Sequence, residues 1–330
     1  MTNAVANGYA SVTTDTGIPG AASPTEWLLT TPGNINTNAL QNFGQVSLDD
    51  EVNNTKLDLV PYNSLKLTQQ YPSAYDRIIA AAPAINWAEF YINSIWRYST
   101  WSLLNSYPTT ASPVLLLSLW DELDGVKDGI ISDVDACRKF NPFRHVGKSF
   151  NCTSTKSELK ISHAASVANA SWTGPRFSNC KSMYPGYDIS SDLPTLAPTN
   201  CTGAVCKSGG EGSVEFSWKT FVKKDMTATL KNATGREFGT IYHHVKRIFA
   251  SNLETNEVDL RGFRDPGGNM ITYHGLVIYL AFKVRFQAKI SQADPSISPG
   301  GTLRYYNKVS DFVGNITSVY KYYQVPALGH

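Results

Sequence analysis

Short, uninterrupted apolar runs separated by helical sequence constrain the fold of this chain most strongly. Arg77–Pro83 is an apolar run closed by a proline, and Asn269–Gly275 is another that ends in a glycine turn. Gly8–Thr14 has the same character, while Leu65–Tyr71 is typical of a helix that stops before Pro72. Runs of this length fit strands buried on both faces, the usual state of a parallel sheet. The pattern predicts an α/β fold in which helices cover both faces of a mostly parallel sheet.

Composition and charge exclude several classes of protein. With 42% hydrophobic and 17% charged residues, the 330-residue chain has the make-up of a folded domain rather than a disordered one. Its formal charge of +2 and its lack of a Lys/Arg cluster argue against nucleic acid or anionic membrane as a partner. No apolar run reaches the roughly 18 residues of a membrane helix. The first ten residues also lack the basic start and apolar core of a signal peptide.

The composition and the spacing of apolar residues change between residues 101 and 260. Gly, Pro and Ser stretches such as Lys207–Gly210, together with irregular spacing of apolar residues, replace the strand and helix patterns. We therefore expect residues 1–100 and 261–330 to form an incomplete α/β core, and residues 101–260 to form a loop-rich lid inserted into it.

Cysteines and glycosylation sequons indicate an oxidising, secretory history. A disulfide between Cys201 and Cys206 could close a small loop, and one between Cys137 and Cys152 a larger loop. Because the number of cysteines is odd, at least one thiol lacks an intrachain partner. The chain is therefore expected to be a secreted glycoprotein whose leader is not part of this sequence. The five cysteines are Cys137, Cys152, Cys180, Cys201 and Cys206, and the six Asn-x-Ser/Thr sequons begin at Asn53, Asn151, Asn169, Asn200, Asn232 and Asn315.

An acidic loop has the chemistry of a calcium site. Asp121, Asp124 and Asp128 place three carboxylates within eight residues, and Gly125 and Gly129 let the backbone curl around them. Calcium takes six to eight oxygen ligands from carboxylates, main-chain carbonyls and water. Taken by themselves, these residues favour a solvated Asp/Gly turn over a calcium site.

Three blocks, in order, resemble the tannase and feruloyl esterase family. They are Gln70–Trp87, Asp121–Ile131, and Phe263–Leu276 together with Pro326–His330. The resemblance covers nearly the whole chain. It implies an α/β-hydrolase-type fold and a secreted carboxylic ester hydrolase that cleaves phenolic esters, galloyl or hydroxycinnamoyl, or the esters of plant cell-wall polysaccharides. It also implies a structural Ca²⁺ held by Asp121, Asp124, Val126, Asp128 and Ile130.

The same resemblance implies a Ser-His-Asp triad and assigns two of its members. His330 matches the base, which must lie within hydrogen-bond reach of the serine. The family pattern Tyr-His-Gly-Leu-Ala-Asp is interrupted after Leu276, and it resumes at Ala293–Asp294 once the sixteen residues Val277–Gln292 are removed. Asp294 is then the acid. A valine codon begins with GT and a glutamine codon can be CAG, so our hypothesis is that Val277–Gln292 is a translated intron.

The nucleophile of the triad has no counterpart in the sequence. The family places a Gly-Cys-Ser-x-Gly-Gly elbow before the helix that leads into the first block, where a tight turn exposes the serine hydroxyl. Here Leu57–Ser64 runs directly into Leu65, and no Gly-x-Ser-x-Gly occurs in the 330 residues. Ser64 lacks the flanking glycines, so no nucleophile is identified and little or no esterase activity is expected. The competing hypothesis is a non-catalytic secreted glycoprotein that binds aromatic ligands.

Overall fold

The computed structural model describes most of the predicted core and part of the predicted lid. The predicted strand Gly8–Thr14 lies outside the described residues. These are residues 6, 24–47, 64–103, 141–152, 157–160, 164–189, 191, 199–202, 205–208, 212–228, 235–276, 294 and 296–326.

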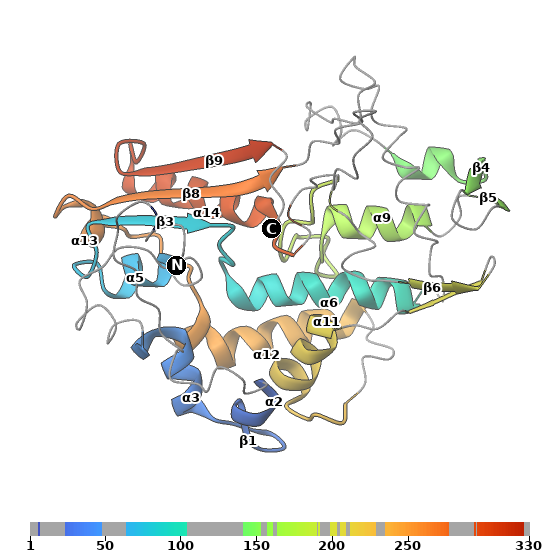
Figure 1. Cartoon of the computed structure of the whole chain (residues 1–330), viewed down its shortest axis with the longest axis horizontal. Coiled ribbons are helices and arrows are strands. Elements are labelled where there is room, and N and C mark those ends of the chain that lie inside the picture. Colours follow the sequence, from blue (N-terminus) through green and yellow to red (C-terminus); the bar gives the residue numbers. More distant parts are fainter. Residues whose placement is uncertain are drawn as a thin grey trace.

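A three-stranded parallel sheet forms the centre of the predicted core (Figure 1). Its order is β3 (Arg77–Ala81), β8 (Asn269–Leu276) and β9 (Tyr320–Pro326), with β8 in the middle. Both neighbouring pairs run parallel. The two apolar runs that predicted parallel strands are therefore confirmed, and β9 adds a third strand that the sequence pattern did not single out.

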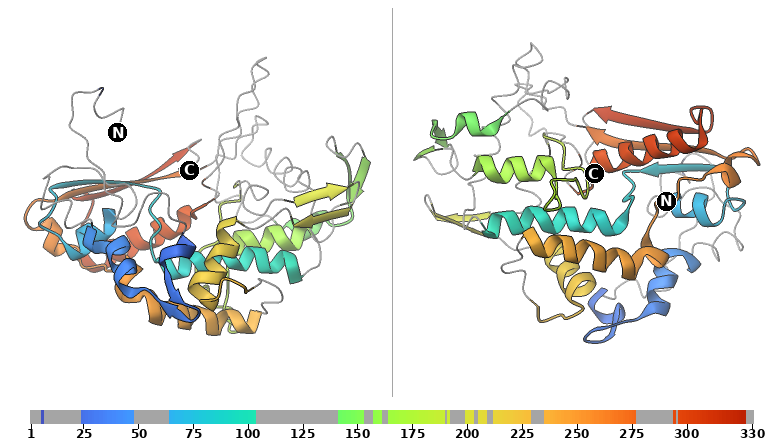
Figure 2. Two further views of the ribbon diagram at one scale, coloured as in Figure 1. Left: turned by 60° about the horizontal axis from the view of Figure 1, so that its bottom comes forward. Right: turned by 180° about the vertical axis from the view of Figure 1, so that it is seen from behind.

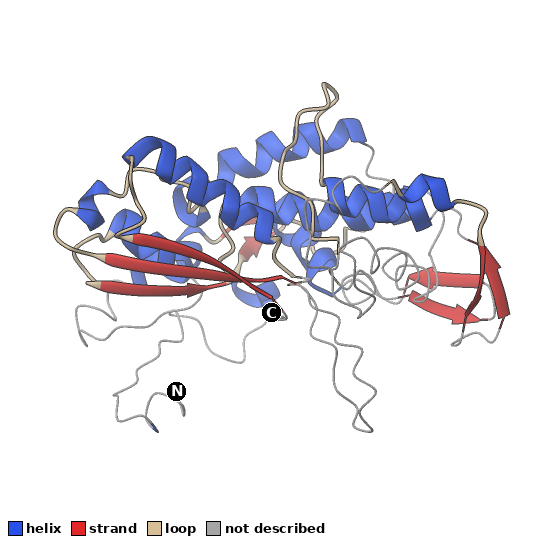
Figure 3. Cartoon of the chain, turned by 90° about the horizontal axis from the view of Figure 1, so that it is seen from above, coloured by secondary structure: helices blue, strands red, loops and turns tan. Residues whose placement is uncertain are grey.

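Helices cover one face of this sheet (Figure 3). They are α5 (Ser64–Gln70), which confirms the predicted helix, α13 (Arg261–Arg264) and α14 (Pro299–Val313). The apolar core between sheet and helices is one cluster of buried side chains. It comprises Leu65, Leu67, Tyr75, Ile78, Ile85, Leu260, Phe263, Met270, Tyr305, Val309, Ile316 and Tyr320.

The opposite face of the sheet is more open than predicted. Along β3 the side chains alternate between exposed and buried, and Ile79 is 44% exposed. Its register partner on β8, Ile271, is 38% exposed. Among the described residues, the expectation of helices on both faces is thus met on one face, and these strands show the alternating burial of a half-covered sheet.

A helical region adjoins the sheet through α6 (Trp87–Leu103), which begins shortly after β3 ends. Figures 1 and 2 show α6 lying alongside α12 (Gly235–Leu253). Trp87 on α6 and Phe221 pack edge to face, with ring centroids 4.4 Å apart. The other elements of this region are α2 (Pro24–Trp27), α3 (Thr37–Gln41), η1 (Asn42–Val46), α9 (Ala164–Thr173), α11 (Gly212–Ser217) and η3 (Trp218–Lys223).

Helix α12 is a regular element that the sequence analysis missed in the region it described as loop-rich. Phe238, Ile241, Val245, Ile248 and Phe249 recur at spacings of three and four, the period of a helix with one apolar face. Phe238 and Phe249 are fully buried against the rest of the helical region. Two histidines and several polar residues between these positions obscure the pattern in the sequence.

The predicted domain boundaries stay a prediction. Leu28 and Leu40 come from the predicted core, yet they belong to the same buried cluster as Phe238 and Val245 of the predicted lid. The two parts of the chain therefore share apolar packing on the helical side, whereas the sheet has a cluster of its own.

Three two-stranded hairpins complete the described structure. In one of them the antiparallel register places Cys201 opposite Cys206, which is compatible with the predicted small loop. The pairing of the cysteines remains a prediction. The hairpins are β1 (Leu29–Thr31) with β2 (Asn34–Ile35), β4 (Ser149–Cys152) with β5 (Ser157–Lys160), and β6 (Thr199–Thr202) with β7 (Val205–Ser208), and a short 3-10 helix η2 spans Pro142–His145.

Within the described part of the chain, no helix combines the length and the apolar character needed to span a membrane.

Candidate active site

The carboxyl ends of the three parallel strands meet at one edge of the sheet, which is where open α/β proteins place their sites. Asp294, the predicted acid, lies at this edge, where its backbone N–H donates to the carbonyl of Gly275 in β8 at 3.4 Å. Strand β9 ends at Pro326, four residues before the predicted base His330. His330 itself lies outside the described residues.

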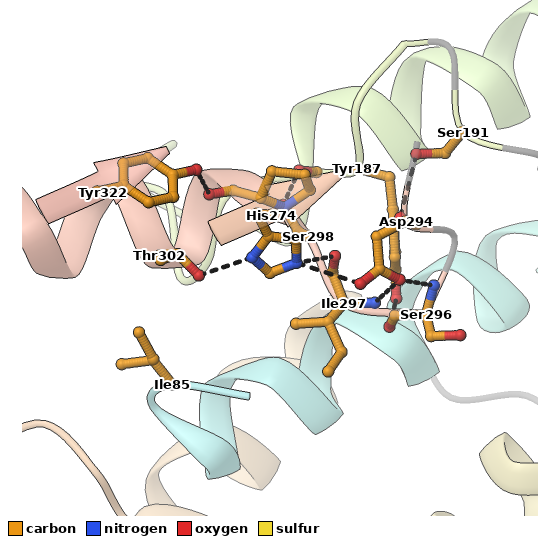
Figure 4. Close-up of polar contacts among 12 residues, drawn as sticks. Ile85, Tyr187, Ser191, His274, Asp294, Ser296, Ile297, Ser298, Thr302 and Tyr322 are labelled. Atoms are coloured by element: carbon orange, nitrogen blue, oxygen red, sulfur yellow. Dashed lines mark hydrogen bonds and ion pairs between the residues drawn. The ribbon is translucent and has the colours of Figure 1, made fainter. Parts of the chain in front are cut away.

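The carboxylate of Asp294 is buried and held by its own loop (Figure 4). Its Oδ1 accepts the backbone N–H of Ser296 at 2.8 Å and that of Ile297 at 2.9 Å. An aspartate that bonds amides two and three residues ahead fixes a turn by itself. The local sequence thus orients the carboxylate before any distant residue contributes.

His274 of β8 is the distant residue that approaches this carboxylate. Its Nε2 lies 3.2 Å from Asp294 Oδ2 and 3.0 Å from the carbonyl oxygen of Ile297. Its Nδ1 lies 2.9 Å from Thr302 Oγ1. A carbonyl oxygen only accepts hydrogen bonds, so we assign a hydrogen to Nε2.

His274 is therefore unsuited to be the base of the site, although it lies beside Asp294, the predicted acid. Its side chain is 0% exposed, and both of its ring nitrogens are engaged within the protein. A general base needs a nitrogen free to take a proton from the attacking group. Sequence reasoning quoted His274 within a family block but gave it no role. Its place next to the glycine that ends an apolar strand was the available signal.

The loop that carries Asp294 is fastened on both sides. Tyr187 donates its hydroxyl to the Ser296 carbonyl at 3.5 Å, and Ser298 donates to the Gly186 carbonyl. Tyr322 of β9 reaches the Pro299 carbonyl at the start of α14 at 3.3 Å, as Figure 4 shows. Contacts from β9 and from Gly186 and Tyr187 thus converge on residues 296–299, next to Asp294.

Helix α14 is anchored to the helical region by a partly buried ion pair. Arg304 of α14 bonds Glu89 near the start of α6, and Glu89 also accepts Lys246 Nζ at 2.7 Å and the Tyr242 hydroxyl at 2.8 Å. Burial would raise the pKa of Glu89, but these three partners outweigh it and hold that pKa below its ordinary value. Gly301, one turn before Arg304, leaves no room for a Cβ because the Tyr184 ring packs against it.

The remaining predicted site residues are the calcium ligands and Ser64. The predicted calcium ligands Asp121, Asp124, Val126, Asp128 and Ile130 lie outside the described residues. Elsewhere in the described ranges, no group of three or more His, Cys, Asp or Glu side chains has a metal-binding arrangement. Ser64 is the first residue of α5.

The fold is that of known tannases and feruloyl esterases. The tannin acyl hydrolase from Aspergillus niger superimposes with a TM-score of 0.74 over 96% of this chain and 62% of that chain, at 18% identity. Feruloyl esterase B from Aspergillus oryzae superimposes with a TM-score of 0.66 over 88% and 58%, at 19% identity. The parallel sheet and this likeness define an α/β-hydrolase-type protein.

Sequence comparison identifies the family. A sequence model of the family "Tannase and feruloyl esterase" matches residues 62–330. A probable feruloyl esterase of Arthroderma benhamiae is 25% identical over 98% of this chain and 62% of its own length, and a probable feruloyl esterase B-2 of Aspergillus terreus is 25% identical over 80% and 46%. The chain belongs to the tannase and feruloyl esterase family. It spans about half to three-fifths of the length of these relatives.

Proposed function

We propose that this chain is a carboxylic ester hydrolase of the tannase and feruloyl esterase type, built to cleave phenolic esters, and that it carries the acid and base of a Ser-His-Asp site without its nucleophile. The observation that carries the proposal is the placement of Asp294. This carboxylate is buried at the carboxyl edge of the sheet, next to β8, and β9 ends four residues before His330 in the sequence. Acid and base in α/β-hydrolases follow strands of one parallel sheet in this way.

In such a site the chain's own residues have defined tasks. The base takes the proton of the attacking hydroxyl and later returns it to the leaving alcohol, while the acid orients the imidazole and stabilises its charged form. The two backbone N–H groups on Asp294 Oδ1 hold the carboxylate in one orientation for that task. Without an attacking serine no acyl-enzyme forms. Loss of a triad nucleophile lowers kcat by about 10⁶, so we expect the chain as written to hydrolyse no measurable ester.

The substrate class rests on the relatives, which are named feruloyl esterases and a tannin acyl hydrolase. We propose hydroxycinnamoyl or galloyl esters, including those of plant cell walls, as substrates. Six sequons support secretion as a glycoprotein. The Asp121–Ile130 loop is proposed to bind a structural Ca²⁺, because three carboxylates and two main-chain carbonyls suit a hard cation.

Grafting an elbow tests the proposal. A Gly-Cys-Ser-x-Gly-Gly segment inserted before Leu65 should confer hydrolysis of methyl ferulate or methyl gallate and labelling by a fluorophosphonate probe. In that background Asp294→Asn should lower kcat by about 10⁴, whereas Asp311→Asn, an exposed change on α14, should not.

Two outcomes would contradict the proposal. Fluorophosphonate labelling of the ungrafted chain would reveal a nucleophile that the sequence does not show. A correctly folded graft whose activity is indifferent to Asp294→Asn would remove the acid. Tight binding of an aromatic ester by the ungrafted chain, with an inactive graft, would instead favour the non-catalytic binding glycoprotein.

A further inference from the structure

His274 makes more polar contacts than a residue that only fills space would need. It is fully buried, yet both ring nitrogens are hydrogen bonded and a carboxylate lies beside one of them. We propose that His274 is a positioning residue, which holds the Asp294 carboxylate through its Nε2–H while Thr302 fixes the orientation of the ring. This inference rests on the proposed role of Asp294 as the acid of the site.

Ile297 and His274 contact each other, and each also contacts the Asp294 carboxylate. Ile297 donates its N–H to Asp294 Oδ1 at 2.9 Å, and its carbonyl accepts the Nε2–H of His274 at 3.0 Å. The same Nε2 lies 3.2 Å from the second oxygen, Oδ2, of Asp294. Turning the carboxylate about its Cβ–Cγ bond would therefore break the hydrogen bonds on Oδ1 and move Oδ2 away from Nε2 of His274. The local turn fixes one oxygen, and His274 fixes the other.

Thr302 supplies the fixed point on the far side of the ring. It lies in the first turns of α14, is 0% exposed, and places its hydroxyl 2.9 Å from Nδ1 of His274. The Arg304–Glu89 ion pair and the packing of Tyr184 on Gly301 hold this end of α14. The ring is thus held between strand β8 and helix α14, and its Nε2–H points to the acid loop (Figure 4).

Two substitutions separate positioning from space filling in the full chain. His274→Phe keeps an aromatic ring of similar size but has no donor. His274→Gln is smaller, but its amide can still donate toward the Ile297 carbonyl and Asp294. If the side chain only fills space, phenylalanine should serve better than glutamine. If it positions the carboxylate, the order is reversed.

The readout is hydrogen exchange at the Ser296 and Ile297 amides, which Asp294 accepts. We expect His274→Phe to speed exchange of both amides by about tenfold or more, the effect of losing about one net hydrogen bond. His274→Gln should stay within about threefold of the wild type on the same grounds. Thr302→Val should behave like His274→Phe, and Thr302→Ser should restore protection. Protection that survives in His274→Phe and fails in His274→Gln would overturn the proposal.

A measurement on the unaltered chain can overturn the proposal even if the variants do not fold. The ¹⁵N spectra of the histidines should show the His274 ring with a hydrogen on Nε2. The ring is assigned by its contacts to Thr302 and Ile297, or by its loss from the spectrum of a His274 variant. A ring with hydrogen on Nδ1 alone would overturn the inference. These readouts need no hydrolysis, so their failure is distinct from failure of the elbow graft.

Discussion

The backbone N–H of Asp294 donates to the carbonyl oxygen of Gly275 at 3.4 Å, although nineteen positions separate them in the chain (294 − 275). If Val277–Gln292 were removed, the two residues would be the first and fourth of the sequence Gly275-Leu276-Ala293-Asp294. A hydrogen bond from the fourth N–H to the first carbonyl is the mark of a β-turn. This hydrogen bond thus keeps Asp294 as close to Gly275 as it would be in the uninterrupted sequence Tyr-His-Gly-Leu-Ala-Asp.

Deleting Val277–Gln292 should therefore preserve the fold and stabilise it. Shortening the connection from eighteen residues to two lowers the entropy cost of closing it, by about 2 kcal/mol. We expect a higher midpoint of urea unfolding and unchanged far-UV circular dichroism. Replacing the same sixteen residues with a Gly/Ser segment of equal length is the matched control and should show no such gain. Loss of folding on deletion, with the Gly/Ser version intact, would show that the length is required. Sequencing the spliced transcript tests the separate hypothesis of an intron.

The Glu89 cluster should be a large contributor to stability. Glu89 is 5% exposed and pairs with Arg304 and Lys246 from two different helices. Glu89→Ala would leave two cations without their partner. Breaking a fully buried ion pair on one side costs about 3–5 kcal/mol, and because Arg304 and Lys246 are 27% and 31% exposed, we expect a loss near the lower end of that range. Glu215→Ala, which removes the more exposed Glu215–Lys219 pair, should cost less than about 1 kcal/mol. Equal losses of unfolding free energy in urea titrations of the two variants would contradict this prediction.

Glu254 should make the stability of the protein fall as pH rises. Burial raises the pKa of Glu254 to about 7, with nearby Glu89 adding to the rise and Lys246 opposing it. The folded state then binds a proton that the unfolded state releases above pH 4.5 or so. This contribution is complete below the unfolded pKa and is lost as pH rises through the folded pKa. On the order of 3 kcal/mol disappears between about pH 4.5 and 7.

A glutamine substitution isolates that contribution. Glu254→Gln resembles the protonated side chain at every pH, so its unfolding free energy relative to the wild type should increase across the same window. Glu215→Gln, on the surface of α11, should leave the pH dependence of the wild type unchanged. A wild-type minus Glu254→Gln difference that stays constant from pH 4.5 to 8 would refute the predicted protonation.

Calcium should stabilise the protein through the Asp121–Ile130 loop. A ligand at 100 times its Kd adds about 2.7 kcal/mol to the unfolding free energy, so EDTA should lower the melting temperature and Ca²⁺ should restore it. Asp124→Asn and Asp128→Asn should weaken this response because each removes a charged oxygen ligand. Asp311→Asn, exposed on α14, is the control. A melting temperature indifferent to millimolar Ca²⁺ would count against the site.

Much of the sheet could be predicted from local patterns, and some of the helices could not. The apolar runs at Arg77–Pro83 and Asn269–Gly275 form strands of a parallel sheet, as their short apolar sequences predict, although in the described structure helices cover only one face of that sheet. The sequence pattern of α12 is weaker, since its apolar residues are interleaved with histidines and charges. The packing of this helix against α6, far from it in the chain, gives it a buried face.

The amino-acid sequence by itself determined two of the three strands of the sheet, the family, and the identity of Asp294 as the candidate acid, because each depends on local patterns or ordered motifs. Only the tertiary structure decided that His274 lies beside Asp294 with both ring nitrogens engaged, and that Arg304 meets Glu89. Those relationships join residues from separate elements. Burial, hydrogen-bond geometry and the closeness of charges arise only when the chain has folded, so no local pattern records them.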